Sequence, residues 1–276
     1  IPHGSIEDGT LRIDRLTADV PDGAEALILD LYRRMPSVRI TDMLLEVDAA
    51  LGFTDAFTHL RTGAPCRDRI GLLNVLLAEG LNLGLRKMAE ATNTHDYWQL
   101  SRLARWHVES EAMNQALAIV VAAQGKLPMS RVWGMGTSAS SDGQFFPTAR
   151  HGEAMNMVNA KYGSVPGLKA YTHVSDQFPP FACQSIPATV SEAPYLLDGL
   201  LMNEVGRHVR EQYADTAGFT DHLFGASSLL GYNLVLRIRD LPSKRLYVFN
   251  PDTTPRELRK LVGGKAREDL IVANWP

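Results

Sequence analysis

The chain has 276 residues, of which 45% are hydrophobic and 21% charged, values that are ordinary for a soluble globular protein. It contains no run of 18 or more apolar residues, which argues against a membrane-spanning helix, and we expect no signal peptide. The formal net charge of −3 gives no general sign of nucleic-acid binding. The chain begins with Ile1 rather than Met, and we expect it to be a piece of a longer protein.

Cysteine and histidine usage excludes two further classes of protein. The two cysteines, Cys66 and Cys183, are too few for a disulfide scaffold and have no CxxC neighbour. We expect both to be reduced and buried in a cytosolic protein. The histidines follow no metal-binding spacing, so the sequence does not favour a structural zinc site.

Residues 1–127 are expected to form a helical region. Apolar residues recur at helical spacing over residues 21–35 and 69–91. Residues 96–124 are the longest candidate, because no Pro or Gly interrupts them, and we expect one continuous helix there. A buried scaffold helix is the simpler interpretation of this segment, and an element that contacts DNA or pairs two subunits is the alternative.

Residues 128–276 have a different pattern, beginning at a break around Pro128. Apolar and polar side chains alternate over 168–175, which predicts a strand. A mixed sheet is indicated by further expected elements: strands over 181–188, 232–240 and 244–250, and helices over 191–204 and 220–231, with caps at Ser191 and Thr220. The fold class that follows is α/β, a mixed sheet preceded by an all-helical region.

The stretch TSASSDGQFF places Asp142 after a run of small hydroxylated residues. A second aspartate, Asp215, follows a short apolar stretch and precedes a helix, and we expect the fold to bring the two strand ends side by side. Neighbouring carboxylates repel each other unless a cation lies between them, and Mg²⁺ prefers such oxygen ligands. A surface turn, in which Asp commonly precedes Gly, is the competing interpretation of Asp142.

From about residue 131 onward the chain resembles the transposases of the Tn3 family of bacterial replicative transposons. The resemblance depends on the stretches SSDGQFF, VNAKYGSVPGLKAYTHVSDQFPPF, LLDGLL, YADTAGFTDHLFGASSLLGYNLVLRIRDL and RLYVFNPD, which occur in the family's order. Residues 1–125 are similar to the region just upstream in the family, with weaker motifs.

The resemblance implies an RNase H-like catalytic domain, of which residues 128–276 would be the N-terminal part. Its catalytic and metal-binding acids would be two aspartates and one glutamate, and the two aspartates correspond to Asp142 and Asp215. The implied cofactor is Mg²⁺ or Mn²⁺. The implied reaction cuts DNA at each transposon end, and the freed 3′-hydroxyl then attacks the target. The implied partners are transposon ends, target DNA and further copies of the protein, in the bacterial cytoplasm and without a membrane.

The chain departs from the family pattern at the third acid. A glutamate is expected on a helix well beyond Asp215, and the nearest acids with helical context, Glu257 and Glu268, are interpreted as solvated helix-face residues. Asp221, which closes the second aspartate's motif, is explained by the dipole at a helix start. We therefore expect two of the three acids here and a fragment that is inactive alone.

Four basic residues are DNA-binding candidates: Arg237, Arg239, Lys244 and Arg245. Phosphate contacts by these side chains would position DNA without reading its sequence, and a strand edge protected by positive charge is the alternative.

Aromatic and hydroxyl side chains also have two interpretations each. Tyr171 and His173 could stack on unpaired bases, whereas core packing is expected for Trp133. A nucleophilic serine before Asp142 is disfavoured, because no His or Lys lies nearby in the sequence to activate it.

Three functions follow from these observations. The first is a metal-dependent DNA transposase. The second is a truncated, non-catalytic relative that binds DNA or pairs with a full-length partner. The third is a different RNase H-like nuclease, which the long family-like stretches argue against.

Overall fold

A computed structural model of the chain describes residues 3–8, 10–14, 19–148, 157–215, 220–237 and 240–275. The chain divides into two compact units, one of residues Ile1–Pro36 with Ile238–Pro276 and the other of residues Ser37–Arg237. No helix in the described ranges is long and apolar enough to cross a membrane. The domain boundary expected at 127/128 stays a prediction.

The first unit contains strands within a segment that was expected to be helical. Strands β1 (Gly4–Glu7) and β2 (Thr10–Ile13) form an antiparallel hairpin, in which Asp8 adopts a positive φ of 49°. Short alternating segments around an Asp are typical of such a hairpin, and the helical expectation is wrong for these residues. The other strands and α-helices described in this unit are α1 (Ala24–Arg34), β9 (Leu246–Val248), β10 (Val262–Lys265) and α11 (Glu268–Ala273).

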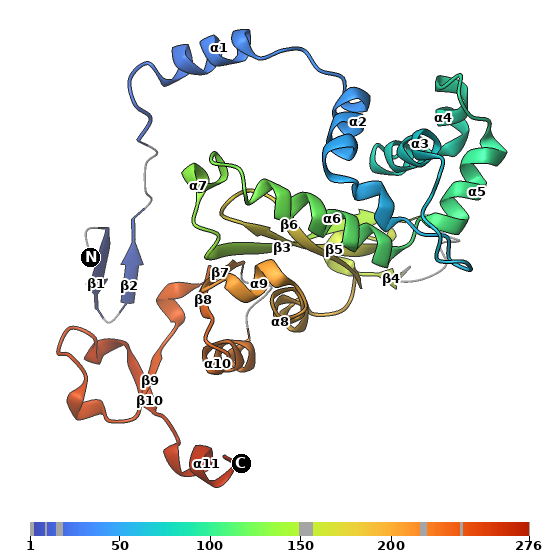
Figure 1. Cartoon of the computed structure of the whole chain (residues 1–276). Coiled ribbons are helices and arrows are strands. Elements are labelled where there is room, and N and C mark those ends of the chain that lie inside the picture. The colour runs from blue at the N-terminus through green and yellow to red at the C-terminus, as the bar shows by residue number, and fades with distance from the viewer. Residues whose placement is uncertain are drawn as a thin grey trace. The chain divides into compact units, whose positions relative to one another are not determined.

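The second unit begins with helices that are shorter than the sequence predicts (Figure 1). The segment 69–91 forms two helices, because Gly84 adopts a φ of +78° at the start of the second. The segment 96–124 also forms two, because Val108 and Glu109 are extended. The helices are α2 (Ile40–Leu51), α3 (Arg69–Gly80), α4 (Leu85–Ala91), α5 (Tyr97–His107), α6 (Ser110–Gln124) and α7 (Ser130–Trp133).

The helices after α7 and the strands confirm the expected mixed α/β sheet. The six described strands have the order β4–β5–β3–β7–β8, and β6 also pairs with β5. The pairs β3–β5 and β5–β6 are antiparallel, whereas β3–β7 and β7–β8 are parallel. The elements are β3 (Ser138–Pro147), β4 (Met157–Val158), β5 (Pro166–Ser175), β6 (Pro180–Pro187), α8 (Ala193–Leu201), α9 (Glu204–His208), β7 (Glu211–Ala214), α10 (Asp221–Leu229) and β8 (Asn233–Leu236).

Of the two helix caps expected in this part of the chain, one is confirmed and the other is displaced. Thr220 caps α10 as expected, since its Oγ1 accepts a hydrogen bond of 3.1 Å from Leu223 N. Helix α8 is instead preceded by Glu192, which makes no side-chain cap. Ser191 lies one residue earlier, and its Oγ accepts from Ala193 N at 3.4 Å. The expected cap at Ser191 is therefore displaced by one position.

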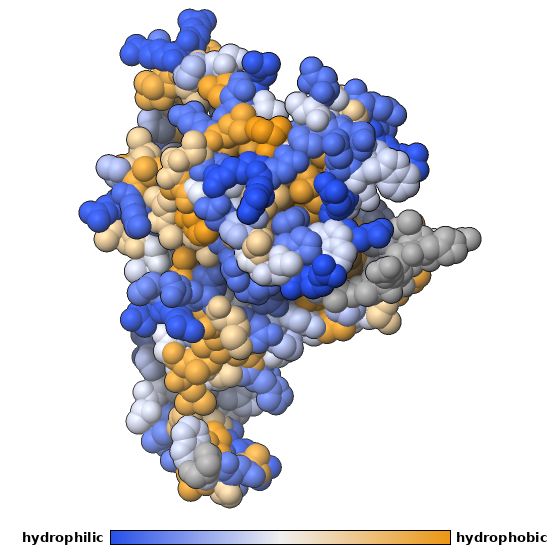
Figure 2. Space-filling model, turned by 45° about the vertical axis from the view of Figure 1, so that its right-hand side comes forward, coloured by the Kyte–Doolittle hydropathy of each residue, from blue (hydrophilic) through white to orange (hydrophobic). Residues whose placement is uncertain are grey.

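Helix α8 packs against β5 and β6, α10 packs against β8, and α6 contacts β6 (Figure 1). A buried cluster that includes Val121 of α6, Tyr171 of β5 and Leu196 of α8 joins these elements. A separate cluster lies among the helices and includes Phe57, Leu72 and Leu100. Apolar side chains also reach the surface, as the orange areas of Figure 2 show, and α1 has no buried residue.

Candidate functional site

Asp142 lies in the middle of a strand, which contradicts the surface-turn interpretation. It is the fifth residue of β3 and pairs with Thr172 of β5. Along β3, Ser141 is buried whereas Asp142 is exposed, because successive side chains point to opposite faces of a sheet. Its Oδ1 accepts a hydrogen bond of 2.8 Å from Gly143 N. The motif therefore presents one carboxylate on the open face of an otherwise small-residue strand.

Asp215 takes the equivalent position on the neighbouring strand. Strands β3 and β7 run parallel, and Ser141 pairs with Ala214. Asp142 follows Ser141 within β3, and Asp215 directly follows Ala214, the last residue of β7. Asp215 is exposed, as Asp142 is. The structure thus brings together the two acids that are 73 residues apart in the chain, as the sequence led us to expect.

A third charged residue continues this row. Ala214 of β7 pairs with Leu236, the last residue of β8. Arg237 directly follows Leu236, and its backbone N donates to Ala214 O at 3.0 Å. Arg237 is exposed. Two carboxylates and one guanidinium therefore follow equivalent positions on three adjacent parallel strands.

The other three basic candidates follow residue 237, where the unit that carries this row ends. Arg239 lies outside the described residues. Lys244 and Arg245 are exposed and belong to the other unit. The guanidinium of Arg245 donates to the carbonyls of Pro242 (3.0 Å) and Lys244 (2.9 Å), so part of its donor capacity is used locally.

The face of the sheet opposite Asp142 holds a buried ion pair that the sequence did not reveal. Lys169 Nζ donates to Glu192 Oε1 and to Val190 O, both at 2.8 Å, and both charged side chains are about 95% buried, at 6% and 5% exposure. A Cβ added at Gly143 would lie 2.6 Å from Glu192 Cδ. Gly143 therefore leaves room for this carboxylate, directly after Asp142.

A buried serine and histidine lie next to this ion pair. Ser141 Oγ lies 2.6 Å from His173 Nδ1 and accepts a 2.7 Å hydrogen bond from Gln212 Nε2. A histidine does lie near these serines in the fold, contrary to expectation, because the register pairs Ser141 with His173. Both side chains are buried, however, and a nucleophile must reach its substrate. We interpret them as a core network.

Burial sets both the pKa and the accessibility of the aromatic candidates. Desolvation lowers the pKa of His173 to about 4, partly opposed by the backbone of Tyr195. Desolvation, followed by the charge of Glu192, raises the pKa of Tyr171. Tyr171 is 1% exposed and His173 0%, so neither can stack on a base. Trp133, by contrast, is 58% exposed, and the expected core position is wrong.

The remaining candidate acids are exposed, and the two cysteines differ in burial. Glu257 lies in a turn rather than a helix, and Glu268 is the first residue of α11; both are exposed, as expected. Among the described residues, no group of three or more His, Cys, Asp or Glu side chains could hold a metal ion. Cys66 is buried, but Cys183 is exposed, so the expectation that both are buried is half wrong.

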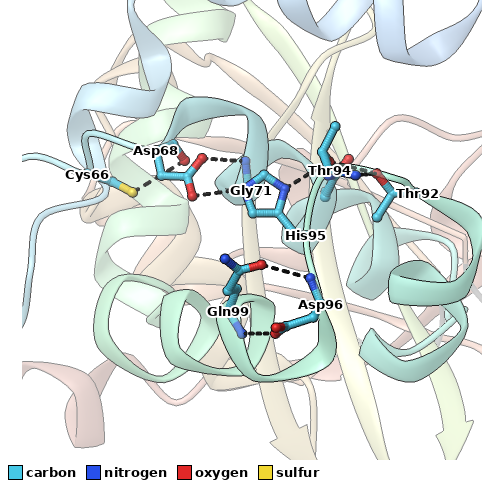
Figure 3. A network of polar contacts seen from close by, with 9 residues as sticks. Cys66, Asp68, Gly71, Thr92, Thr94, His95, Asp96 and Gln99 are labelled. Atoms are coloured by element: carbon cyan, nitrogen blue, oxygen red, sulfur yellow. Dashed lines mark hydrogen bonds and ion pairs between the residues drawn. The ribbon is translucent and has the colours of Figure 1, made fainter.

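A polar network in the helical part was not anticipated from the sequence (Figure 3). Asp68 caps α3, since its Oδ1 accepts from Gly71 N at 2.9 Å, and its Oδ2 lies 2.9 Å from His95 Nε2. Asp96 and Gln99 form a capping box at the start of α5. The D-x-x-Q spacing was the one local signal that could have predicted it.

The chain matches a known protein family over most of its length. The family model described as "Tn3 transposase DDE domain" matches residues 42–276. This chain belongs to that family. It is 42% identical, over all of its length, to the transposase for transposon Tn501 of Pseudomonas aeruginosa and to the transposase for transposon Tn21 of Escherichia coli. It is 36% identical, over 98% of its length, to the transposase for transposon Tn1546 of Enterococcus faecium.

The DDE-domain chain spans only part of these relatives, 28% of the length of each of the three. Among solved structures, a piggyBac transposase synaptic complex with hairpin DNA aligns with 63% of this chain and 41% of its own, at 12% identity and a TM-score of 0.33. A similarity of that size supports no argument about fold or function.

Proposed function

We propose that this chain is the segment of a Tn3-type DNA transposase that supplies two of the catalytic acids for strand cleavage and strand transfer at transposon ends. The observation that carries the proposal is the register that places Asp142 and Asp215 at equivalent positions on parallel strands. Antiparallel β6–β5–β3 followed by β7 and β8 parallel to β3 supports an RNase H-like fold.

The donor atoms at this site fit a hard divalent cation. Both side chains offer carboxylate oxygens, which Mg²⁺ and Mn²⁺ prefer, and Mg²⁺ commonly takes only one or two protein carboxylates beside phosphate oxygens. Asp142 and Asp215 would hold the ion. When bound, such an ion supplies positive charge that stabilises a phosphodiester during in-line displacement.

The chain's own residues would bind and orient the DNA strand. Ser140, the exposed neighbour of Asp142 on the same face of β3, is small and leaves space for a phosphodiester. Arg237, next in the row after Asp215, would contact a neighbouring phosphate as a positioning residue. Lys244, Arg245 and Arg239 stay DNA-binding proposals, as do self-association and action on DNA in the bacterial cytoplasm.

A truncated, non-catalytic relative is the second candidate. The observation that favours it is that the described residues contain no third acid beside Asp142 and Asp215. Such a protein would bind DNA or pair with a full-length partner, and would retain this role when either aspartate is replaced.

The test is Asp142→Asn in a full-length transposase that contains this segment. We expect cleavage of transposon-end DNA to fall by a factor of about a thousand or more, with DNA binding largely retained, since one carboxamide replaces one carboxylate. Asp221→Asn is the matched control, because the start of α10 explains that carboxylate, and it should cut at close to the normal rate. Unchanged cleavage by the Asp142→Asn protein would reject the proposal.

A further inference from the structure

A concave site lies among the helices, away from the row of aspartates in the chain. It is a cavity of about 380 Å³ whose lining includes His59, Arg67, Asp68, Arg102, Trp106 and His107. The loop before α3 supplies the first three of these residues, and α5 supplies the others. The proposed function uses none of them.

Two arginines in this lining have no partner for their charge among the described residues. Arg67 and Arg102 are exposed, and within the described ranges neither makes a side-chain hydrogen bond or ion pair. Arg69 provides the contrast, because it binds Asp48 at 3.0 Å and Asp55 at 2.8 Å. The guanidinium groups at the cavity are therefore available to an anion from outside the chain.

The acidic residue in the lining does not cancel this charge. The carboxylate of Asp68 is directed at the first turn of α3 and at His95, as Figure 3 shows. A carboxylate at this end of a helix is stabilised by the helix dipole. The thiol of Cys66 adds no negative charge either, because burial raises its pKa.

The aromatic side chains of the lining form a stack that the fold holds in place. The rings of His59 and Trp106 lie parallel within 10°, with centroids 5.0 Å apart, and His107 meets His59 edge-on at 5.3 Å. Leu60 N donates to Trp106 O at 2.9 Å, which ties the loop to the end of α5. Trp106 remains 37% exposed, so part of its ring faces solvent.

We propose that this cavity binds single-stranded DNA, with a backbone phosphate between Arg67 and Arg102 and a base against Trp106. Guanidinium groups match phosphate geometry and are more weakly hydrated than ammonium groups. Bases stack on exposed aromatic rings without regard to sequence, and a basic surface beside such rings is the usual single-strand site. An acidic peptide would use the arginines but would leave the Trp106 surface without a role.

The choice of DNA as the ligand rests on the proposed function, but the site does not depend on the two aspartates. A failure of the single-strand site can therefore be distinguished from a failure of the proposed catalytic role of the aspartates. The Asp142→Asn chain should bind single-stranded DNA at this cavity as the unchanged chain does, whether or not Asp142 is catalytic.

The experiment titrates a fluorescently labelled oligothymidine of about 15 nucleotides with the whole chain and follows anisotropy at about 50 and 200 mM salt. For Arg67→Gln/Arg102→Gln we expect binding at least tenfold weaker and a smaller salt dependence, because a phosphate contact is lost. The matched control is Arg86→Gln/Lys87→Gln on α4, which removes the same charge from exposed residues that do not line the cavity. It should bind within about threefold of the unchanged chain.

Substitutions of Trp106 test the proposed contact with a base. Trp106→Ala should weaken single-strand binding roughly tenfold, whereas Trp106→Phe keeps a stacking surface and most of the affinity. Duplex DNA, whose bases are already stacked, should be insensitive to Trp106→Ala. Thermal unfolding of every variant shows whether the chain still folds.

Three results would overturn the proposal. The first is equal binding by the arginine variant and its control. The second is loss of duplex and single-strand binding in equal measure with no effect at Trp106, which would make the cavity a general anion patch. The third is binding of an acidic peptide that competes fully with the oligonucleotide and is also insensitive to Trp106.

Discussion

Gly143, the residue after Asp142, has no room for a side chain. A Cβ at this position would lie 2.6 Å from Glu192 Cδ and under 3 Å from both carboxylate oxygens, and the ion pair with Lys169 holds that carboxylate in place. We expect Gly143→Ala to lower the free energy of unfolding by about 1–3 kcal/mol, since overpacking displaces a buried group. Urea unfolding measures it.

Gly225 in α10 is the matched control for this change. A Cβ there meets nothing within 4 Å, and Ala is favoured over Gly inside a helix. Gly225→Ala should therefore leave the free energy of unfolding unchanged or raise it by up to about 1 kcal/mol. If the two glycine variants lose stability equally, the contact between Gly143 and Glu192 does not constrain the strand that carries Asp142.

His173 makes the stability of the chain depend on pH. Its pKa falls from 6.5 to about 4 on folding, chiefly through desolvation, so between these values the unfolded chain binds more protons. Protonation of His173 therefore leaves the free energy of unfolding unchanged above about pH 6.5 and lowers it as the pH falls toward 4. This loss of unfolding free energy is about 3 kcal/mol in all and about 2 kcal/mol by pH 5.

His173→Gln isolates this contribution from that of the carboxylates. Denaturant unfolding of both proteins at pH 7 and pH 5 should show a fall in the free energy of unfolding that is smaller by about 2 kcal/mol in the variant. The absolute stability of the variant will be lower, because Ser141 loses its imidazole partner. Parallel pH dependences would mean that His173 titrates normally in the folded chain.

At the scale of single elements, helix α5 depends on its first residues. Asp96 Oδ1 accepts from Gln99 N, and Asp96 N donates to Gln99 Oε1, both at 2.8 Å. Asp96→Ala removes one side of this capping box and should cost about 1 kcal/mol of unfolding free energy, whereas Asp96→Asn should retain most of it. Thermal or urea unfolding compares the two, and equal losses would show that the cap contributes nothing specific.

Elements with a local signal were predictable from the sequence, and those set by distant contacts were not. Thr220, a good N-cap, predicted the start of α10, and the alternation over 168–175 predicted β5. The break between α5 and α6 has no such signal, because Val108 and Glu109 are neither Pro nor Gly. It follows a helix end whose His107 Nδ1 contacts Phe57 O at 3.2 Å, fifty residues earlier.

The candidate site also has features that the sequence predicts and features that it does not. Asp142 and Asp215 could be selected from their motifs. Their expected positions at the ends of strands were enough to predict that they would lie side by side. The face of β5 could not be predicted, because the polar positions Lys169 and His173 are the buried ones and Leu168 and Val174 are only partly buried. That inversion depends on Glu192 and Ser141, which the chain brings from other elements.

At the scale of the whole chain, nearly all of the core belongs to one unit. Both clusters of buried apolar residues lie between residues 37 and 237. Of the buried apolar side chains that the structure describes, Leu261 alone comes from the other unit. Burial of apolar surface is the dominant favourable term in folding, so the two units should differ greatly in intrinsic stability.

We therefore expect residues 37–237, expressed alone, to fold and to unfold in one cooperative transition. The ends of this segment are the points at which the chain passes between the two units, and a domain with its own core can fold by itself. The thermal midpoint, measured by circular dichroism, should lie within about 5 °C of that of the same segment in the whole chain.

A non-cooperative melt of residues 37–237 would show that the first unit stabilises the sheet that carries Asp142 and Asp215. Hydrogen exchange in the whole chain provides the complementary measurement. Amides of β3, β5 and β7 should exchange only through global unfolding, because they lie at the centre of the sheet, whereas those of β9 and β10, in a unit with so little buried apolar surface, should exchange through local opening of lower free energy. Equal protection in both units would contradict the independence of the larger one.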